Sequence, residues 1–230
     1  MTNPNLAARI DGIFLGAVAQ RWNGRPPSAI AKTAFDGRQD IGALGFTGDE
    51  QADLKHHGGR DKAIHHYPTD HYPTWIADAQ IPAGSAPAAF GENLATLGMT
   101  ETNICIGDRL RLGTAVVEVS QGRQPCWKVS EHTGNPKMAF LFQETGRTGW
   151  YYRVLEPGQL TKGDQIILIE RNHPEWSVST VTRARLTRRV SRRDAETLAG
   201  LQVLAKGWRS AFACMASGEN EEDTTARLLG

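Results

Sequence analysis

The chain has only three cysteines, a net charge of +1 and no long apolar run, and each shortage excludes a class of protein. Cys105, Cys126 and Cys214 are sparse and odd in number, which argues against a disulfide-stabilised domain and for a reducing compartment. The small net charge provides no global field that would recruit nucleic acid or a membrane surface. The longest apolar runs, such as "AFLF", are too short to cross a bilayer, and the first residues lack the layout of a signal peptide. We therefore expect a cytoplasmic protein.

The first two thirds of the chain consist of short strand-like segments separated by glycine-rich turns. Leu110 and Leu112 alternate with polar residues in "DRLRLG", "AVVEVS" has a similar pattern, and "DQIILIE" is a short apolar run. Closely spaced strands of this kind favour a barrel-like β architecture over alternating βαβ units. Two helices are predicted within this region, one over residues 72–79 and one that starts after Asn135 and ends near Gly146.

The last quarter of the chain changes to helical periodicity. Apolar residues recur at helical spacing over 178–186 and again over 208–215, and Ser191 with Asp194 resembles a capping box between them. The sequence therefore predicts a mainly β fold of the α+β type. Its expected parts are a barrel-like domain over 1–172, a three-helix unit over 173–217 and a polar tail over 218–230.

Cys126 lies in the segment "SQGRQPCWKV", directly after a predicted strand. Pro125 restricts the backbone before it, and Arg123 and Lys128 are close to it in the sequence. Neighbouring cations favour the thiolate, which is the reactive and metal-binding form of cysteine. A functional role is therefore as plausible for this thiol as a buried structural one, whereas the other two cysteines lie in apolar segments and are expected to be structural.

Three chemistries remain open for a functional thiol at this position. A nucleophile needs a histidine base within hydrogen-bond distance, and the candidates are His57, His65, His66, His71 and His132. Zinc needs three or four ligands, yet "KHHGGRDKAIHHYPTDH" contains no histidine pair at the i, i+4 spacing of one helix face. The third option is a thiolate that holds a metal whose other ligands belong to an organic cofactor, which predicts anion-binding loops elsewhere in the chain.

Loops of this kind are present. In "KHHGGRDKA", Gly58 and Gly59 would let backbone N–H groups approach an anion, while Lys55, His57 and Lys62 supply positive charge. Two further segments, "SAIAK" with its lysine and "FGENL" with its carboxylate and amide, offer contacts to a heterocycle. A basic surface turn explains the first loop equally well when it is considered alone.

Taken together and in this order, "SAIAK", "GDEQADLKHHGGRDKAIHHYP", "FGENL", "IGDRLRLG", "VSQGRQPCWK" and "TGRTGWYYRVLEPG" resemble the MOSC domain. This is the C-terminal domain of molybdenum cofactor sulfurases. The resemblance spans about residues 10–215. It is greatest to the bacterial YiiM-like branch of the family, whose members add a three-helix C-terminal unit.

The resemblance implies a barrel-like fold that binds molybdenum–molybdopterin, with Cys126 as the catalytic residue and the protein ligand of molybdenum. The implied cofactor-binding residues are Lys32, Lys55, His57, Gly58, Gly59, Asp61, Lys62, Glu92 and Asn93. Arg123 and Arg147 are basic residues in matching segments and are assigned to the pterin phosphate. The chain departs from the family pattern at His56 and at Arg60, where proline is common, and both residues make the loop more basic.

The resemblance also implies a function, because related proteins reduce N-hydroxylated compounds such as hydroxylamino-purines to amines, a detoxifying role. The alternatives are a carrier that holds sulfur as a persulfide, or the cofactor itself, at Cys126 for other enzymes, and a plain binding module. Candidate aromatic contacts to a planar substrate are Trp127, Tyr67 and Trp150, each equally explained by the core. Candidate proton donors are Asp61, Glu92 and a histidine.

The expected partners follow from what the chain does not contain. It has neither a CxxC cluster motif nor a GxGxxG loop, so a separate electron-donor protein is expected. Six arginines between residues 183 and 193 could face an acidic electron carrier or form a solvated helix face with internal salt bridges. Nothing resembles a helix-turn-helix motif, so nucleic-acid binding is not expected, and a homodimer is the expected assembly.

Overall fold

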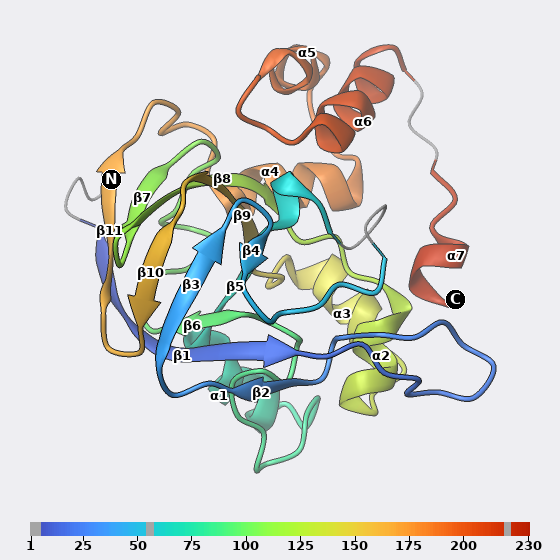
Figure 1. Cartoon of the computed structure of the whole chain (residues 1–230). Coiled ribbons are helices and arrows are strands. Elements are labelled where there is room, and N and C mark those ends of the chain that lie inside the picture. The colour runs from blue at the N-terminus through green and yellow to red at the C-terminus, as the bar shows by residue number, and fades with distance from the viewer. Residues whose placement is uncertain (1–5, 54–57, 219–221) are drawn as a thin grey trace.

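The centre of the molecule is a closed β-barrel, shown in Figure 1 for a computed structural model that describes residues 6–53, 58–218 and 222–230. Within these residues the barrel strands are β1 (Ala7–Gly16), β5 (Ile64–Pro68), β6 (Leu94–Thr96), β7 (Arg109–Leu112), β8 (Ala115–Gly122), β9 (Trp150–Glu156) and β11 (Gln165–Glu170). They pair in the order β11-β7-β8-β9-β5-β6-β1, and β1 also pairs with β11. All neighbours are antiparallel except β5 and β6. The predicted barrel is therefore confirmed, and its closure removes the free sheet edges.

Alternation of apolar and polar residues places the core inside the barrel. Leu110 and Leu112 of β7 are both fully buried, as their spacing predicts. In β11 the continuous apolar run also alternates, because Ile166 is buried while Ile167 and Ile169 are exposed. A strand in a barrel has one face toward the interior, so only every second residue of the run enters the core.

A second, smaller sheet and an extension of the barrel carry the segments that lead to the site. The three-stranded sheet contains β3 (Arg38–Gly42), β4 (Gly45–Phe46) and β10 (Gly158–Thr161). Strand β2 (Lys32–Ala34) pairs with the C-terminal half of β1, opposite Gly16. The chain after β4 returns toward this end of β1, where the backbone N–H of Gly16 donates to Asp49 over 2.7 Å.

Helices α1 (Tyr72–Ala77), α2 (Trp127–Thr133) and α3 (Met138–Thr145) are inserted between the barrel strands. The first and third agree with the predicted helices, although α3 begins two residues later than expected, with Lys137 rather than Asn135 at its N-cap. Helix α2 was not predicted, because seven residues are too few to show a helical period. It begins directly after Cys126, whose backbone is extended (φ −137°, ψ 166°).

The C-terminal helices pack on one side of the barrel (Figure 1). They are α4 (Val178–Thr187), α5 (Arg192–Gly200) and α6 (Lys206–Ala216), in the predicted three-helix region. The side chain of Ser191 caps α5 by accepting from the backbone N–H of Asp194 over 3.1 Å. Phe212 and Leu198 belong to the same hydrophobic cluster as barrel residues such as Val119, so the helices and the barrel share one core. Among the described residues, no helix has the length and apolar character needed to cross a bilayer.

The segment expected to be a polar tail contains a short helix instead. Helix α7 (Thr225–Leu228) buries Leu228, which is 4% exposed, in a second hydrophobic cluster formed with α1, α2 and α3. The Arg227 guanidinium donates to the carbonyl of Pro125 over 2.5 Å and to Gln143 over 2.9 Å. A single buried leucine in a polar segment produces no repeating pattern of apolar residues. The sequence pattern therefore did not predict that Leu228 packs against the rest of the fold.

Candidate functional site

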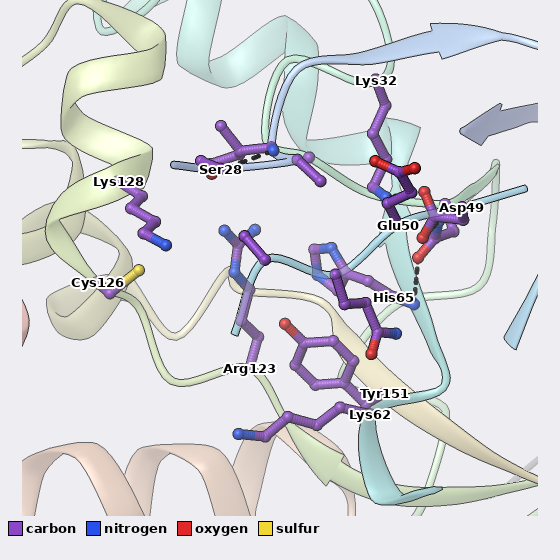
Figure 2. A pocket seen from close by; sticks show the side chains of 16 residues that line it. Ser28, Lys32, Asp49, Glu50, Lys62, His65, Arg123, Cys126, Lys128 and Tyr151 are labelled. Atoms are coloured by element: carbon purple, nitrogen blue, oxygen red, sulfur yellow. Dashed lines mark hydrogen bonds and ion pairs between the residues drawn. The ribbon is translucent and has the colours of Figure 1, made fainter. Parts of the chain in front are cut away.

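Cys126 is half-buried at the junction of two adjoining pockets. Figure 2 shows its thiol facing the same space as the side chains of Arg123 and Lys128. We name the first the Lys32 pocket, and its chemically informative lining residues are Lys32, Asp49, Glu50, Lys62, His65, Asn93, Arg123, Cys126, Lys128 and Tyr151. We name the second the Trp127 pocket, of about 540 Å³, which is lined by Pro26, Pro27, Ala52, Asp53, Lys62, Gln121, Arg123, Gln124, Cys126, Trp127, Lys128, Tyr151, Ala226 and Arg227.

Three cations surround the thiol in both pockets. Lys62 comes from the short helix before β5, Arg123 follows β8, and Lys128 lies in the first turn of α2. Burial lowers the pKa of Lys62, and the nearby charges of Asp53 and Cys126 oppose this shift. Such a concentration of positive charge at the beginning of a helix suits a bound anion.

A buried polar cluster forms the floor of the Lys32 pocket. Lys32 makes an ion pair with Asp49, and the two side chains are only 7% and 5% exposed. Asp49 also accepts from the Asn93 side-chain amide over 2.8 Å, and the Asn93 Oδ1 accepts from the backbone N–H of His65 over 3.0 Å. Burial lowers the pKa of Lys32, although Asp49 acts in the opposite direction. The structure therefore brings the predicted residues Lys32 and Asn93 together through Asp49. The sequence analysis did not single out Asp49, although this residue lies within one of the segments that resemble the family.

Glu92 lies behind the pocket and not in its wall. It is fully buried and accepts hydrogen bonds from the Tyr72 hydroxyl over 2.5 Å and from the backbone N–H groups of Ala88 and Phe90 over 2.8 and 3.1 Å. Burial is the main reason that the pKa of Glu92 is raised. These hydrogen bonds hold the turn before Asn93, and Glu92 is not among the residues that line either pocket.

The two arginines assigned to a phosphate lie in different places. Arg123 is 7% exposed, donates to the carbonyl of Phe90 over 2.6 Å and lines both pockets. The Arg147 guanidinium instead packs over the ring of Trp75, 5.4 Å from its centroid, and lines neither pocket. Only Arg123 is thus brought to Cys126.

The glycine loop is partly described and opens onto a third adjoining pocket. Gly58, Gly59 and Asp61 line this third pocket, which shares Lys62 with the other two. The Asp61 carboxylate accepts from Arg153 over 2.7 Å, so its charge is balanced by an ion pair. The predicted residues Lys55 and His57, together with His56, lie outside the described residues.

Two of the candidate histidines, His65 and His66, make hydrogen bonds to groups other than the thiol. His65 lines the Lys32 pocket, and burial, reinforced by the charge of Arg123, keeps its pKa well below the ordinary value. His66 lies in the core between the hydroxyls of Tyr152 and Thr96. In the part of the chain that the structure describes, no group of three or more histidines, cysteines or acidic residues could hold a metal ion.

Of the three aromatic candidates, only one reaches the site. Trp127 lines the pocket named after it and packs edge-on against Trp22 at 5.4 Å. Tyr67 and Trp150 are fully buried in the core, as the structural interpretation predicted. Tyr151 lines both pockets and was missed, because alternation within "GWYYRV" does not indicate which aromatic residue faces a cavity.

The fold and the site combine a closed β-barrel with a thiol in a cationic cavity. Residues 53–167 match the MOSC domain. The chain is 43% identical over 173 residues to the uncharacterized protein YflK of Bacillus subtilis, covering 73% of this chain and 75% of that protein. It is 43% identical over 161 residues to protein YiiM of Escherichia coli, with coverage of 69% and 71%. The chain belongs to the MOSC domain family.

Solved structures agree with this assignment. The crystal structure of YiiM from Escherichia coli is similar with a TM-score of 0.80 at 31% identity, covering 98% of this chain and 100% of that one. YiiM from Geobacillus stearothermophilus has a TM-score of 0.77 at 30% identity, with coverage of 91% and 99%.

A protein of Gibberella moniliformis named "Reductase" is 44% identical over 170 residues, which are 73% of this chain but 30% of that protein.

Proposed function

We propose that this chain binds the molybdenum cofactor in the pockets around Cys126 and reduces N-hydroxylated compounds to amines. The observation that carries the proposal is the position of the Cys126 thiol, half-buried among Lys62, Arg123 and Lys128 at the junction of two pockets. Membership of the MOSC family and a fungal relative named "Reductase" support an oxidoreductase that uses this cofactor.

The residues of the site fit such a group. A single thiolate is a suitable soft ligand for molybdenum but cannot complete its coordination, so the remaining ligands must come from an organic partner. Cys126 would be the protein ligand of the metal. Lys32, Arg123 and Lys128 would bind the anionic and polar groups of the cofactor, and the polar cluster of Asp49 and Asn93 keeps Lys32 in place.

The reaction consumes two electrons and two protons, cleaves the N–O bond and releases an amine and water. When bound, the cofactor would supply the two-electron redox chemistry, and a separate redox protein would supply the electrons. The chain's own residues orient the ligands and deliver protons. Lys62 Nζ is the proton donor that we assign to the leaving oxygen, because Lys62 lines both pockets beside Cys126 and burial lowers its pKa.

The test is a Cys126→Ser variant made in a host that synthesises the cofactor. We expect the wild-type protein to contain stoichiometric molybdenum and to reduce a hydroxylamino-purine with an artificial electron donor. The variant should lose both properties, because a serine hydroxyl is a poor substitute for a soft thiolate. Cys214→Ser is the matched control, since Cys214 is exposed and lines neither pocket.

The outcomes separate the alternatives. Wild-type protein without molybdenum would reject the proposal and leave a plain binding module. Transfer of labelled sulfur from Cys126 to an acceptor enzyme, without reduction of any N-hydroxylated compound, would show the carrier function instead.

A further inference from the structure

A third pocket, which no step of the proposed reaction uses, adjoins the Trp127 pocket. It encloses about 540 Å³, and we name it the Gly207 pocket. Its lining residues are Gly58, Gly59, Arg60, Asp61, Lys62, Gln121, Gln124, Arg185, Ala205, Gly207 and Trp208. Lys62, Gln121 and Gln124 line both this pocket and the Trp127 pocket, so a ligand that starts beside Cys126 can extend into it.

The first feature of the Gly207 pocket is an uncapped helix N-terminus. Helix α6 is eleven residues long, and Ala205 at its N-cap makes no side-chain capping bond. The N–H groups of Trp208 and Arg209 both donate to the carbonyl of Ala205. Within the described residues, the N–H groups of Lys206 and Gly207 have no hydrogen-bond acceptor. Free N–H groups at the positive end of a helix dipole bind oxyanions.

The second, independent feature is a buried arginine with a free donor. The Arg185 side chain is only 9% exposed, and its terminal nitrogens donate to Glu222 over 2.6 and 3.0 Å. Its Nε is buried and has no hydrogen-bond partner among residues 6–53, 58–218 and 222–230. An unsatisfied buried N–H is costly, and because Arg185 lines the pocket, a turn of its side chain that exposes Nε to a ligand oxygen would relieve that cost.

The charge balance of the pocket favours an anion. Arg60, Lys62 and Arg185 line it, and Arg60 is exposed at its edge. Among the described lining residues, Asp61 is the only acidic one, and it is paired with Arg153. Arg185 is paired with Glu222, which does not line the pocket. A tetrahedral oxyanion matches these donors because it can accept from backbone N–H groups and from a guanidinium at the same time.

We propose that the Gly207 pocket binds the phosphate monoester of the substrate, and that the protein therefore acts on N-hydroxylated nucleotides in preference to free bases and nucleosides. The inference rests on the proposed function, since the reacting base would lie beside Cys126 in the Trp127 pocket. There Trp127 and Tyr151 offer aromatic surface to a planar heterocycle.

The test removes one backbone donor at the start of α6. Gly207 is the second residue of α6, and a Cβ at this position meets no atom within 4 Å, so an alanine side chain fits. Proline at the second position of a helix already occurs in this chain, at Pro73 of α1. Gly207→Pro deletes the N–H that would face the phosphate, whereas the matched control Gly207→Ala keeps it.

The experiment measures kcat/KM for a hydroxylamino-purine as base, ribonucleoside and 5′-monophosphate, together with molybdenum content. We expect wild type and Gly207→Ala to prefer the monophosphate over the nucleoside by about tenfold, the scale of charge-assisted hydrogen bonds. Gly207→Pro should lose most of this preference, with unchanged molybdenum content and unchanged rates on base and nucleoside. Equal rates of the wild type on nucleoside and monophosphate would overturn the proposal. A fall in molybdenum in Gly207→Pro would also overturn it, because the pocket would then hold the phosphate of the cofactor.

A binding measurement keeps this inference separate from the proposed reaction. Titration of AMP and adenosine into the purified protein requires no turnover, and we expect AMP to bind about tenfold more tightly to wild type and Gly207→Ala but not to Gly207→Pro. If Gly207→Pro fails to fold, Arg60→Ala replaces it, with the exposed Arg189→Ala as control. Arg60→Ala should weaken AMP binding by about threefold, as expected for one partly exposed cation. Equal affinity of the wild type for AMP and adenosine would sink the proposal even if the reductase activity is found.

Discussion

At the scale of single residues, the site depends on charges that are buried in pairs. Lys32 and Asp49 are each almost inaccessible to water, and Asp49 is held further by the backbone N–H of Gly16 and the amide of Asn93. Removing one partner would leave the other charge buried without compensation, which is strongly destabilising. The ammonium group of Lys32 is therefore held in one position in the pocket. A flexible surface lysine would not hold a ligand in a fixed position.

The buried side chain of His66 allows the effect of burial on a single pKa to be tested. Burial lowers the pKa of His66 from 6.5 to about 3, while its ring remains hydrogen-bonded to Tyr152 and Thr96. The unfolded chain takes up this proton at a higher pH than the folded chain. The stability that depends on neutral His66 is therefore fully present above about pH 6.5 and is lost as the pH falls toward 3.

We expect His66→Gln to reduce the slope of unfolding free energy against pH between pH 6.5 and 3 by up to about 1.4 kcal/mol per pH unit. Urea unfolding at a series of pH values measures this slope. His173→Gln, at a partly exposed position, is the control with which the slope of His66→Gln is compared. An unchanged slope in His66→Gln would contradict the assignment.

At the scale of elements, the short helices α2 and α7 shape the cavity. Helix α2 places Cys126 at its N-cap, and Gly134 ends the helix with a left-handed backbone (φ 71°) that favours glycine. Helix α7 brings Ala226 and Arg227 into the wall of the Trp127 pocket. Both helices are too short for periodicity to reveal, and tertiary contacts stabilise them.

The burial of Leu228 predicts that α7 depends on this one side chain. Leu228→Ala should lower the free energy of unfolding by about 2 kcal/mol, the lower end of the cost for a buried leucine, and should speed proteolytic removal of the C-terminus. Leu229→Ala is the matched control, because Leu229 is 56% exposed. Denaturant unfolding and limited proteolysis measure the two effects. Equal behaviour of the two variants would contradict the packing of α7.

At the scale of the whole molecule, the barrel and the C-terminal helices form one cooperative structure. The inferred division at residues 172 and 173 describes the order of elements along the chain, but the core crosses it. Phe212 and Trp208 of α6 and Val181 of α4 lie in the same cluster as Val119 of the barrel. A continuous core of this kind is expected to unfold in one step.

Phe212→Ala should therefore destabilise the barrel as well as the helices. We expect a loss of about 3–5 kcal/mol, typical of a buried phenylalanine, with one transition seen equally by far-UV and near-UV circular dichroism. Phe140→Ala is the control, because Phe140 is 43% exposed. An early transition of the helices alone, with the barrel signal unchanged, would show two separate domains instead.

Local patterns of the sequence sufficed for the barrel, the helices α4 to α6 and the cationic surroundings of Cys126. Alternation and helical spacing are properties of neighbouring residues, and Arg123 and Lys128 lie close to Cys126 along the chain. Local patterns made Lys32, Lys62 and Asn93 candidates, but only the family resemblance assigned them to one site, since their importance lies in contacts across the fold.

Only the tertiary structure decided which motif residues reach the cavity. It placed Glu92 behind the pocket and Arg147 against Trp75, and it added Asp49 and Tyr151 to the lining. The physical reason is that the closure of the barrel and the packing of the helices determine the direction of each side chain. Which face of a loop meets a cavity depends on residues far away in the sequence, and no local pattern contains that information.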